Sequence, residues 1–397
     1  MEYKTYKLGT CFSLIENGAI IKQRKEAKGF PITRIETLSH GKFNRDKLGH
    51  ADIFDTTPYK RYFLEDKDLI MSHINSRAFL GRTVLYRKKG NEQIIHGMNV
   101  LRIKTNEQFL DPVFASYLFK TSHFKKAIDS IRKDAINQSS INIFDICNIQ
   151  ISLPSITEQR KISHALQLID KKIETNHLIN DNLEAMAKQL YDYWFVQFDF
   201  PNEEGKPYKS SGGAMVWNDK LKREIPKEWM ASNYTDLFTI GNGQTMPQNE
   251  GLVPAYGGNG IVKMVEISNY PACIIIGRVG ANCGSIHYSK VPCWVSDNAI
   301  SICSKNDDWQ PFLFYSLKLY NLSKNKGGSS QPLITHEALK HLYFPMSEKH
   351  INQFCHIVNE LQDLIYSNQQ EILKLTKQRD ELLPLLMNGQ ATVNYHL

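Results

Sequence analysis

The chain carries few residue patterns that could support catalysis. It contains neither a GxxxxGK(S/T) loop, which would cradle nucleotide phosphates, nor the Asn/Asp-Pro-Pro-Tyr/Phe motif of adenine methyltransferases. Asp55 with Glu65-Asp66-Lys67 has loosely the form of a metal-dependent nuclease site, in which acidic residues and a lysine surround a metal ion. Such triplets are common by chance, and the second half of the chain has no counterpart. The residues therefore predict a protein without a catalytic site.

Metal and cofactor sites are not indicated either. The thirteen histidines include no HExxH pair, and the seven cysteines include no CxxC pair. The glycine-rich segment from Tyr256 to Gly260 lacks the GxGxxG spacing of a dinucleotide site and is interpreted as a turn. We therefore expect the chain to bind no metal and no cofactor.

The composition is that of a folded protein with more than one core. The 397 residues exceed the size of one ordinary domain, and 42% of them are hydrophobic. The formal net charge of +7 is compatible with nucleic-acid binding but does not establish it. No apolar signal region begins the chain, and no run of about 18 apolar residues occurs, so we expect a cytoplasmic protein that does not enter a membrane.

The sequence contains two similar halves. In the first half, Gln138-Ser139-Ser140 is followed by an alternating segment and Pro154. In the second half, Ser329-Ser330-Gln331 is followed in the same order by Pro345. A long helical pattern begins after each proline. The chain is therefore predicted to be an internal repeat.

Each long helical pattern carries an apolar seam whose spacing alternates between four and three residues, which is the period of a coiled coil. The two seams match over an offset of 192 residues, and the match includes the polar pair Asn176 and Asn368. The predicted seam positions are Ile162, Leu166, Ile169, Ile173, Asn176, Asn180, Leu183, Ala187, Leu190 and Trp194 in the first helix, and Phe354, Val358, Leu361, Ile365, Asn368, Ile372, Leu375, Arg379, Leu382 and Leu386 in the second.

A seam of this length has to be covered by another surface. Its 33 residues correspond to a helix about 50 Å long, and a bare apolar stripe of that length would face water. The simplest cover is the second copy of the pattern, so the two helices are predicted to pair as a coiled coil in which a buried Asn fixes the register. The alternative is that each helix packs on its own globular domain.

A mixed region of about 150 residues precedes each helix. Short apolar runs predict strands at residues 68–72, 99–103, 273–277 and 298–302. A short helix that opens on a proline is predicted at Pro112 and again at Pro311. The fold class is therefore α+β, with two mixed domains that alternate with two long helices.

The order of these parts gives the predicted domain boundaries. The proline- and glycine-rich residues 200–213 are interpreted as a linker. The predicted parts are a first globular domain at 1–153, the first long helix at 154–200, the linker and second globular domain at 201–345, and the second long helix at 346–397.

Four segments in a fixed order relate the chain to a known family. They are residues 154–162 (PSITEQRKI), 191–201 (YDYWFVQFDFP), 208–213 (YKSSGG) and 382–389 (LLPLLMNG). With these segments, the chain resembles the specificity subunits of type I restriction-modification enzymes over nearly its whole length. The second helix start, SEKHI at 347–351, departs from the first because it lacks the Gln.

The resemblance implies a function that the residues alone do not. In that family, two target recognition domains alternate with two long helices that pack antiparallel as a pseudo-twofold spacer, and each domain reads one half of a split DNA target. The implied partners are double-stranded DNA, two methyltransferase subunits and restriction (translocase) subunits. S-adenosylmethionine, ATP and Mg would belong to those partner subunits, and this chain would hold no catalytic residue.

A DNA-reading role requires basic side chains for phosphates and polar side chains for base edges. The candidates in the first domain are Lys22, Gln23, Arg24, Lys25, Arg34, Arg77, Arg82, Gln138 and Ser139. The candidates in the second domain are Gln244, Asn249, Tyr256, Asn259, Arg278, Asn282, Ser329, Ser330 and Gln331. Each of these residue types is also common on any solvated surface.

Two alternatives stay open at the level of sequence. The coiled coil could space two protein-binding domains, in which case the chain would be a scaffold that does not bind DNA. The aromatic residues Tyr191, Trp194, Phe195 and Phe198 at the exit of the first helix could form a docking surface for a partner or could cap the coiled coil.

Overall fold

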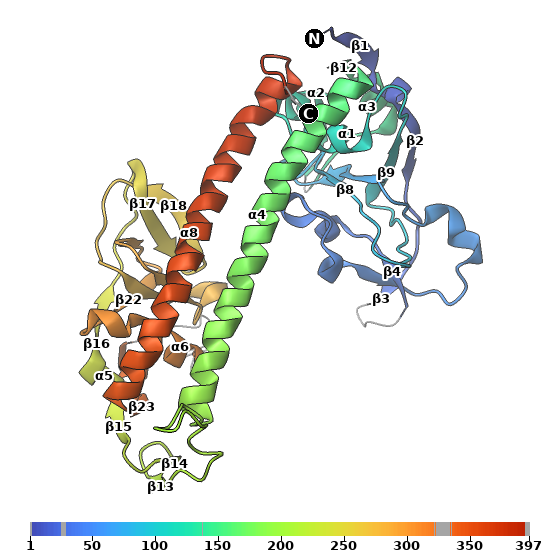
Figure 1. The fold of residues 1–397 in the computed structure, drawn as a ribbon. Coiled ribbons are helices and arrows are strands. Elements are labelled where there is room, and N and C mark those ends of the chain that lie inside the picture. The colour runs from blue at the N-terminus through green and yellow to red at the C-terminus, as the bar shows by residue number, and fades with distance from the viewer. Residues whose placement is uncertain are drawn as a thin grey trace. The chain divides into compact units, whose positions relative to one another are not determined.

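The computed structural model of the chain describes residues 2–24, 29–136, 138–320, 322, 334 and 336–393. The chain divides into two compact units: unit 1 comprises Met1–Ile173 and Leu373–Leu397, and unit 2 comprises Glu174–Ile372. Each unit contains one globular region and a part of both long helices, α4 (Ile156–Tyr191) and α8 (Glu348–Met387) (Figure 1). Among the helices of the described residues, none is long and apolar enough to cross a membrane.

The two long helices pack together in antiparallel orientation. In unit 1, the guanidinium of Arg379 donates to the Asp170 carboxylate at 2.9 Å. In unit 2, the side-chain amide of Asn368 donates to Asn180 at 2.9 Å. Residue numbers on α8 fall as those on α4 rise, which defines an antiparallel pair. The predicted pairing of the helices is confirmed.

The seam positions are mostly buried, but burial is interrupted in the second half of α8, before Leu386. The buried members are Ile162, Leu166, Ile173, Asn176, Asn180, Ala187, Trp194, Phe354, Val358, Ile365 and Leu386. Leu382, by contrast, is 38% exposed. Asn176 donates to Glu371 at 2.7 Å rather than to its repeat counterpart, so the two seam asparagines have different partners.

Unit 1 is built around a small antiparallel sheet. Its elements are β1 (Lys4–Lys7), β2 (Phe12–Asn17), β3 (Gln23–Arg24), β4 (Phe30–Ile32), β5 (Gly49–Ala51), β6 (Leu69–Ser72), β7 (Ile74–Asn75), β8 (Thr83–Leu85), β9 (Val100–Thr105), α1 (Pro112–Leu118), α2 (Ser122–Ser130), β10 (Lys133–Asp134), β11 (Ser139–Ser140), α3 (Ile143–Asn148) and β12 (Gln150–Leu153). The main sheet has the order β2-β9-β6-β8, and β1 pairs with β12. Two smaller sheets, β3-β5-β4 and β10-β11-β7, complete the unit.

Unit 2 repeats this plan. Its elements are β13 (Met215–Asn218), β14 (Arg223–Pro226), β15 (Met230–Asn233), α5 (Tyr234–Leu237), β16 (Phe238–Asn242), β17 (Glu250–Gly257), β18 (Gly260–Val265), β19 (Cys273–Gly277), β20 (Ile286–Ser289), β21 (Trp294–Val295), β22 (Ala299–Ser304), α6 (Gln310–Leu319), α7 (His336–Lys340) and β23 (Tyr343–Met346). The main sheet order, β16-β22-β19-β20, matches that of unit 1 strand for strand, and β15 pairs with β23 as β1 does with β12. The predicted internal repeat and α+β fold class are confirmed.

Each core joins a sheet to both long helices. In unit 1, Leu101 and Ile103 of β9 share one buried cluster with Phe114 of α1, Ile162 of α4 and Leu386 of α8. The Pro112 helix begins where the sequence predicts, because the Asp111 carboxylate accepts the backbone N–H of Phe114 at 2.8 Å and so caps its first turn. The helices are therefore part of each globular core rather than an attached rod.

The segment interpreted as a linker is packed against unit 2. After a π-helical turn at Asp192–Val196, the ring of Phe200 stacks on Tyr208 and on Trp229, with centroid distances of 4.8 and 4.9 Å. The aromatic residues at the helix exit, Tyr191, Trp194, Phe195 and Phe198, are all buried in the unit 2 core. These aromatics cap the helix pair, and the interpretation as an exposed docking surface is wrong.

Candidate nucleic-acid interface

A buried amide anchors the start of α4 to unit 1. The Gln159 side chain is fully buried, accepts the backbone N–H of Asp111 at 2.9 Å, and donates to the carbonyls of Phe109 and Pro154 at 2.8 and 3.0 Å. In the second repeat the matching position is Ile351, which is also fully buried. The Gln of the PSITEQRKI segment therefore holds the domain on the helix and does not face a ligand.

A tyrosine from each short helix fixes the domain to the helix pair at equivalent places. In unit 1, the Tyr117 hydroxyl of α1 donates to Asp170 at 2.6 Å, on the same carboxylate that binds Arg379. In unit 2, the Tyr315 hydroxyl of α6 accepts from Gln362 at 2.9 Å. Gln362 is the repeat counterpart of Asp170, 192 positions further on. The globular regions of both units are thus held by the same kind of contact.

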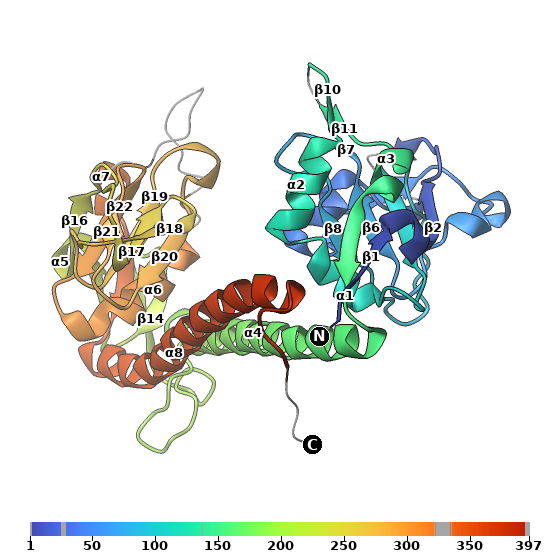
Figure 2. The ribbon, with the colours of Figure 1, turned by 90° about the horizontal axis from the view of Figure 1, so that it is seen from above.

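The hairpin formed by β10 and β11 projects from the body of unit 1 (Figure 2). It is held in place by β7, since Ser139 pairs with Asn75 across β11 and β7. Arg132 donates twice to the Asp134 carboxylate, at 2.6 and 3.1 Å, and the Ser139 hydroxyl donates to the same carboxylate at 2.6 Å. Ser139 is a correction to the predicted interface, because its buried side chain stabilises the hairpin and does not face outward.

The strongest DNA-binding candidates of unit 1 lie on this hairpin and in the turn that follows β7. Arg77, Lys133 and Gln138 are exposed. The Arg132 guanidinium holds the pKa of Asp134 below its usual value, with smaller contributions from Ser139 and Arg77. The local negative charge is therefore compensated by two arginines, and Lys133 stays available for a phosphate.

Sequence reasoning missed Ile136, at the end of this hairpin. Its side chain is fully exposed, at 102% of the reference area. A fully exposed isoleucine on the β10–β11 hairpin, beside Lys133 and Gln138, is suited to apolar contact in a DNA groove. The available signal was an apolar residue inside an otherwise polar turn.

The other basic candidates of unit 1 are partly engaged within the protein. The Nε of Arg34 donates to the side-chain carbonyl of Gln23. Arg82 stacks on the Phe79 ring, with its guanidinium carbon 4.2 Å from the ring centroid. Lys22 is exposed. Of Arg24 only the backbone is described, as part of β3, and Lys25 lies outside the described residues.

The candidates of unit 2 gather around β17, β19 and the turns that follow them. The exposed members are Gln244, Asn249, Asn259 and Asn282, and Arg278 is partly exposed. The Asn249 amide donates to Glu266 at 3.0 Å. The backbone N–H of Gln244 donates to Val295 at 2.9 Å, which fixes the chain at Gln244 while its side chain faces solvent. Ser329, Ser330 and Gln331 lie outside the described residues.

Tyr256 is a second correction. It lies on β17 but is only 8% exposed, and its ring packs with Cys273, Cys293 and Val295. Burial raises its pKa to about 12. The side chain therefore belongs to a small core under the candidate surface and cannot reach a base edge from there.

The acidic residues that loosely resembled a nuclease site have structural roles. The Asp55 carboxylate accepts the backbone N–H of Thr57 at 2.9 Å. Glu65 binds Lys104 at 2.7 Å and Arg102 at 3.1 Å, and the Lys104 ammonium lowers the pKa of this carboxyl. In the part of the chain that the structure describes, no group of three or more His, Cys, Asp or Glu side chains is placed to hold a metal ion.

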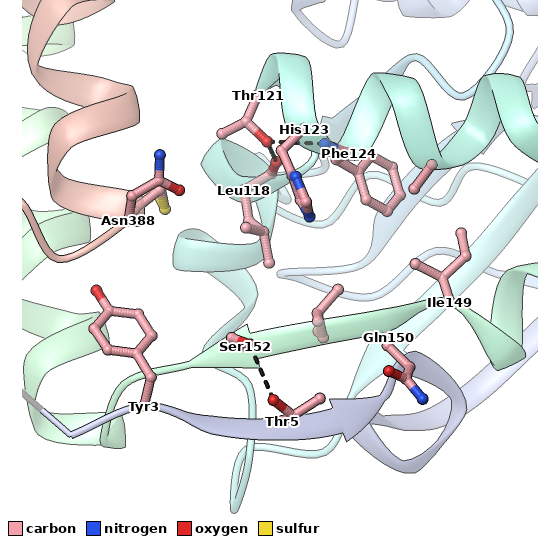
Figure 3. A pocket seen from close by; sticks show the side chains of 13 residues that line it. Tyr3, Thr5, Leu118, Thr121, His123, Phe124, Ile149, Gln150, Ser152 and Asn388 are labelled. Atoms are coloured by element: carbon pink, nitrogen blue, oxygen red, sulfur yellow. Dashed lines mark hydrogen bonds between the residues drawn. The ribbon is translucent and has the colours of Figure 1, made fainter.

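A pocket of about 650 Å³ lies in unit 1 where β1, β12, α2 and the end of α8 meet (Figure 3). Tyr3, His123 and Asn388 are among the polar residues that line it, and the hydroxyls of Thr5 and Ser152 lie 3.1 Å apart at its floor. Thr121 and Gln150 add further polar groups, and the rest of the lining is apolar. The lining contains no residue of the hairpin or of the other DNA-binding candidates, so the pocket is separate from the candidate interface.

Comparisons with known proteins give the family. A family model described as a type I restriction modification DNA specificity domain matches residues 1–185 and 226–382. The putative type I restriction enzyme MjaX specificity subunit of Methanocaldococcus jannaschii is 27% identical over 413 residues, which is 99% of this chain and 94% of that protein. The type I restriction enzyme MjaIX specificity subunit of the same organism is 27% identical over 309 residues, which is 70% of this chain and 68% of that protein.

A solved structure agrees on the fold. The crystal structure of a type I restriction-modification system S subunit from M. genitalium superposes with a TM-score of 0.60, covering 99% of this chain and 97% of that one at 17% identity. At this identity the likeness concerns the fold alone. The family model, in contrast, matches both halves of the sequence, each with its globular region and long helix. The chain therefore belongs to the family of type I restriction modification DNA specificity domain proteins.

Proposed function

We propose that the chain is the DNA-reading specificity subunit of a type I restriction-modification complex, without catalytic activity of its own. The single observation that carries this is the repeated architecture: two domains with the same strand order are joined to one antiparallel helix pair by matched contacts. The relatives that cover this chain are named for specificity, and none of the described residues forms a metal site. The chain would act in the cytoplasm, where it meets DNA.

The repeat favours a bipartite and asymmetric target. Two similar domains on an antiparallel pair would be related by an approximate twofold axis, and duplex DNA has local twofold axes as well. The two reading surfaces differ, because unit 1 presents the β10–β11 hairpin and unit 2 presents β17 and the turns around Asn259 and Asn282. The two half-sites should therefore differ in sequence and be separated by a spacer that is not read.

The division of the chain follows from this role. Residues 1–153 and 201–345 would be the two target recognition domains, and residues 154–200 and 346–397 the two spacer helices. Lys22, Arg77 and Lys133 would neutralise phosphates. Gln138, with Gln244, Asn259 and Asn282 in unit 2, would read base edges, for which amide side chains can both donate and accept.

The partners would supply the chemistry. We propose two methyltransferase subunits, each carrying S-adenosylmethionine, and restriction subunits that use ATP and Mg, all assembled around this chain on double-stranded DNA. This assignment rests on the family and on the relatives' names. The chain itself would hold no cofactor.

The decisive experiment is selection of DNA by the chain together with its methyltransferase partner, followed by sequencing. We expect two short conserved blocks of different sequence at one fixed separation. Recovery of one continuous motif, or of unrelated sequences, would contradict the bipartite reader.

The scaffold alternative is separated by salt. If the chain neutralises several phosphates, the logarithm of its DNA affinity should fall linearly with the logarithm of salt concentration, with a slope near the number of contacts. A coiled-coil scaffold for two protein-binding domains should retain no DNA even at low salt. Retention without salt dependence would fit neither proposal.

Independence of the two readers is testable by exchange. Replacing residues 1–150 with the equivalent region of a relative leaves α4 intact, because that helix begins at Ile156. We expect one half-site to change and the other to stay the same in the selection experiment. A change in both half-sites would mean that the units do not read independently.

A further inference from the structure

Three cysteines of unit 2 meet at one end of its main sheet. Cys273 is the first residue of β19, and its sulfur lies 3.6 Å from that of Cys293, which directly precedes β21. Ile274 faces Ile302 across β19 and β22, so Cys303 lies opposite Cys273 at the next position of the same strand pair. Cys273 and Cys293 are fully buried, whereas Cys303 is partly exposed.

The same place in unit 1 is occupied by charged residues. Leu69 faces Ile103 there as Ile274 faces Ile302 in unit 2, so Asp68 corresponds to Cys273 and Lys104 to Cys303. Asp68 binds the buried guanidinium of Arg102 at 2.7 Å, and Lys104 binds Glu65 at 2.7 Å. The repeated sheet end is therefore held by ion pairs in one unit and lined by thiols in the other.

The three sulfurs are not equivalent in reactivity. Hydrogen bonding with Cys273 lowers the pKa of Cys293 and of Cys303, while the pKa of Cys273 is raised. The thiolate is the nucleophilic form of cysteine. Cys303 combines a lowered pKa with access to solvent, and Cys273, whose pKa is raised, stands next to it, which is the arrangement of a reactive cysteine beside a resolving one.

We propose that Cys303, Cys273 and Cys293 form an oxidation-sensitive site that closes to a Cys273–Cys293 disulfide when the chain meets a peroxide. The Cys303 thiolate attacks the peroxide, so that an S–O bond forms, the O–O bond breaks and hydroxide leaves as water. Cys273 then attacks the sulfenic sulfur while its thiol proton passes to the departing oxygen, so that an S–S bond forms and the S–O bond breaks with loss of a second water. Cys293 displaces Cys303 from this disulfide, and Cys303 returns to a thiol.

Closure at Cys293 would act on the DNA-reading surface of unit 2. Cys293 leads directly into Trp294–Val295, which pairs with β17 and accepts the backbone N–H of Gln244. To reach bonding distance from 3.6 Å, the two sulfurs must approach by more than 1 Å, and whatever part of this shift the side chains do not take up displaces the strand that holds Gln244. This consequence rests on the proposed function, whereas the disulfide itself does not.

The disulfide is tested on the full-length chain treated with hydrogen peroxide, alkylated, digested without reductant and analysed by mass spectrometry. We expect two peptides joined by a Cys273–Cys293 disulfide, and a thiol reductant should separate them. Cys303→Ser should slow its formation, Cys293→Ser should trap Cys273–Cys303, and Cys273→Ser should abolish both. Cys273→Ala is a second substitution at the same position, and the unfolding of each variant is measured beside it. Together they distinguish loss of the thiol from loss of the fold. No disulfide in the native chain, or pairing spread over the other four cysteines, would overturn the proposal.

The DNA consequence has a separate readout. The test compares the native target with targets altered only in the half-site that unit 1 reads, called the first half-site. With the methyltransferase partner present, oxidation should weaken binding to both kinds of target by about tenfold, which is the loss expected for the contacts of one base pair. Discrimination within the first half-site should be unchanged. If the disulfide forms but DNA binding is unaffected, the link to reading is wrong and the modification site stands. If no DNA is bound in either redox state, the proposed function fails instead.

Discussion

At the scale of single residues, the contacts that hold the domains on the helices matter more than the exposed polar residues that sequence reasoning favours. Gln159 looks like an ordinary polar residue in a helical first turn. In the structure its amide completes three hydrogen bonds in a fully buried place, to Asp111, Phe109 and Pro154. Burial cannot be read from one sequence, so neither composition nor period could identify this role.

Replacing this amide is a direct test. Gln159→Ala leaves two buried backbone groups and one partly buried group without this partner, so we expect unit 1 to lose about 3 kcal/mol of unfolding free energy. Urea unfolding, followed by fluorescence, measures this loss as a lower midpoint. Gln353→Ala, on the exposed surface of the other helix, serves as the control and should change the midpoint little. Equal effects would mean that the hydrogen bonds contribute nothing specific.

A buried histidine gives unit 1 a predictable pH dependence. His96 is fully buried, and burial lowers its pKa to about 4 from the ordinary value of 6.5. The unfolded chain therefore binds a proton between pH 6.5 and 4 that the folded chain does not. The stabilising contribution is complete above pH 6.5 and is lost as the pH falls toward 4, with a loss of about 2 kcal/mol at pH 5.

The measurement is the unfolding free energy at pH 7 and pH 5. His96→Gln should reduce the difference between the two, because the titrating group is gone. His123→Gln removes an exposed histidine and should leave the difference as it is. An unchanged pH dependence in His96→Gln would show that the histidine titrates normally in the folded state.

At the scale of elements, the helices and strands with a regular residue pattern could be predicted from the sequence, and the short projecting hairpin could not. The long helices, the strand at β19 and the proline-led helices α1 and α6 all follow from spacing and residue type. The β10–β11 hairpin was not predictable, since its strands have two residues each and depend on pairing with β7 far away in sequence. The interpretation of residues 200–213 as a linker was wrong for a different reason. Their glycines and prolines indicate a loose segment, whereas the ring of Phe200 stacks on Tyr208 and Trp229.

The hairpin is where a phosphate contact is tested. Lys133→Ala removes one exposed cation from β10 without disturbing the Arg132 and Asp134 pair. We expect weaker binding to all DNA sequences and a salt slope smaller by about 0.9, the value for one neutralised phosphate. Lys171→Ala, on the exposed surface of α4, is the matched control and should keep the slope. Loss of sequence preference without a change of slope would assign Lys133 to a base instead.

At the scale of the whole molecule, the length of the helix pair should set the length of the spacer between the two half-sites. Each unit has buried seam positions of its own, among them Ile173 of α4 in unit 1 and Ile365 of α8 in unit 2. Seven residues added at equivalent places in both helices preserve the seam, because the heptad is its repeat. They lengthen each helix by about 10 Å, which corresponds to about three base pairs of DNA.

We therefore expect a chain with one heptad inserted after Ile173 and another after Ile372 to select the same two half-sites with a spacer longer by about three base pairs. Seven residues added to the exposed turn after Glu204 lengthen the chain equally but not the helices, and should leave the spacer unchanged. Selection and sequencing with the methyltransferase partner measures both. An unchanged spacer in the helix variant would mean that something other than the helices sets the distance between the half-sites, whereas altered half-sites would mean that the helix pair also shapes the reading surfaces.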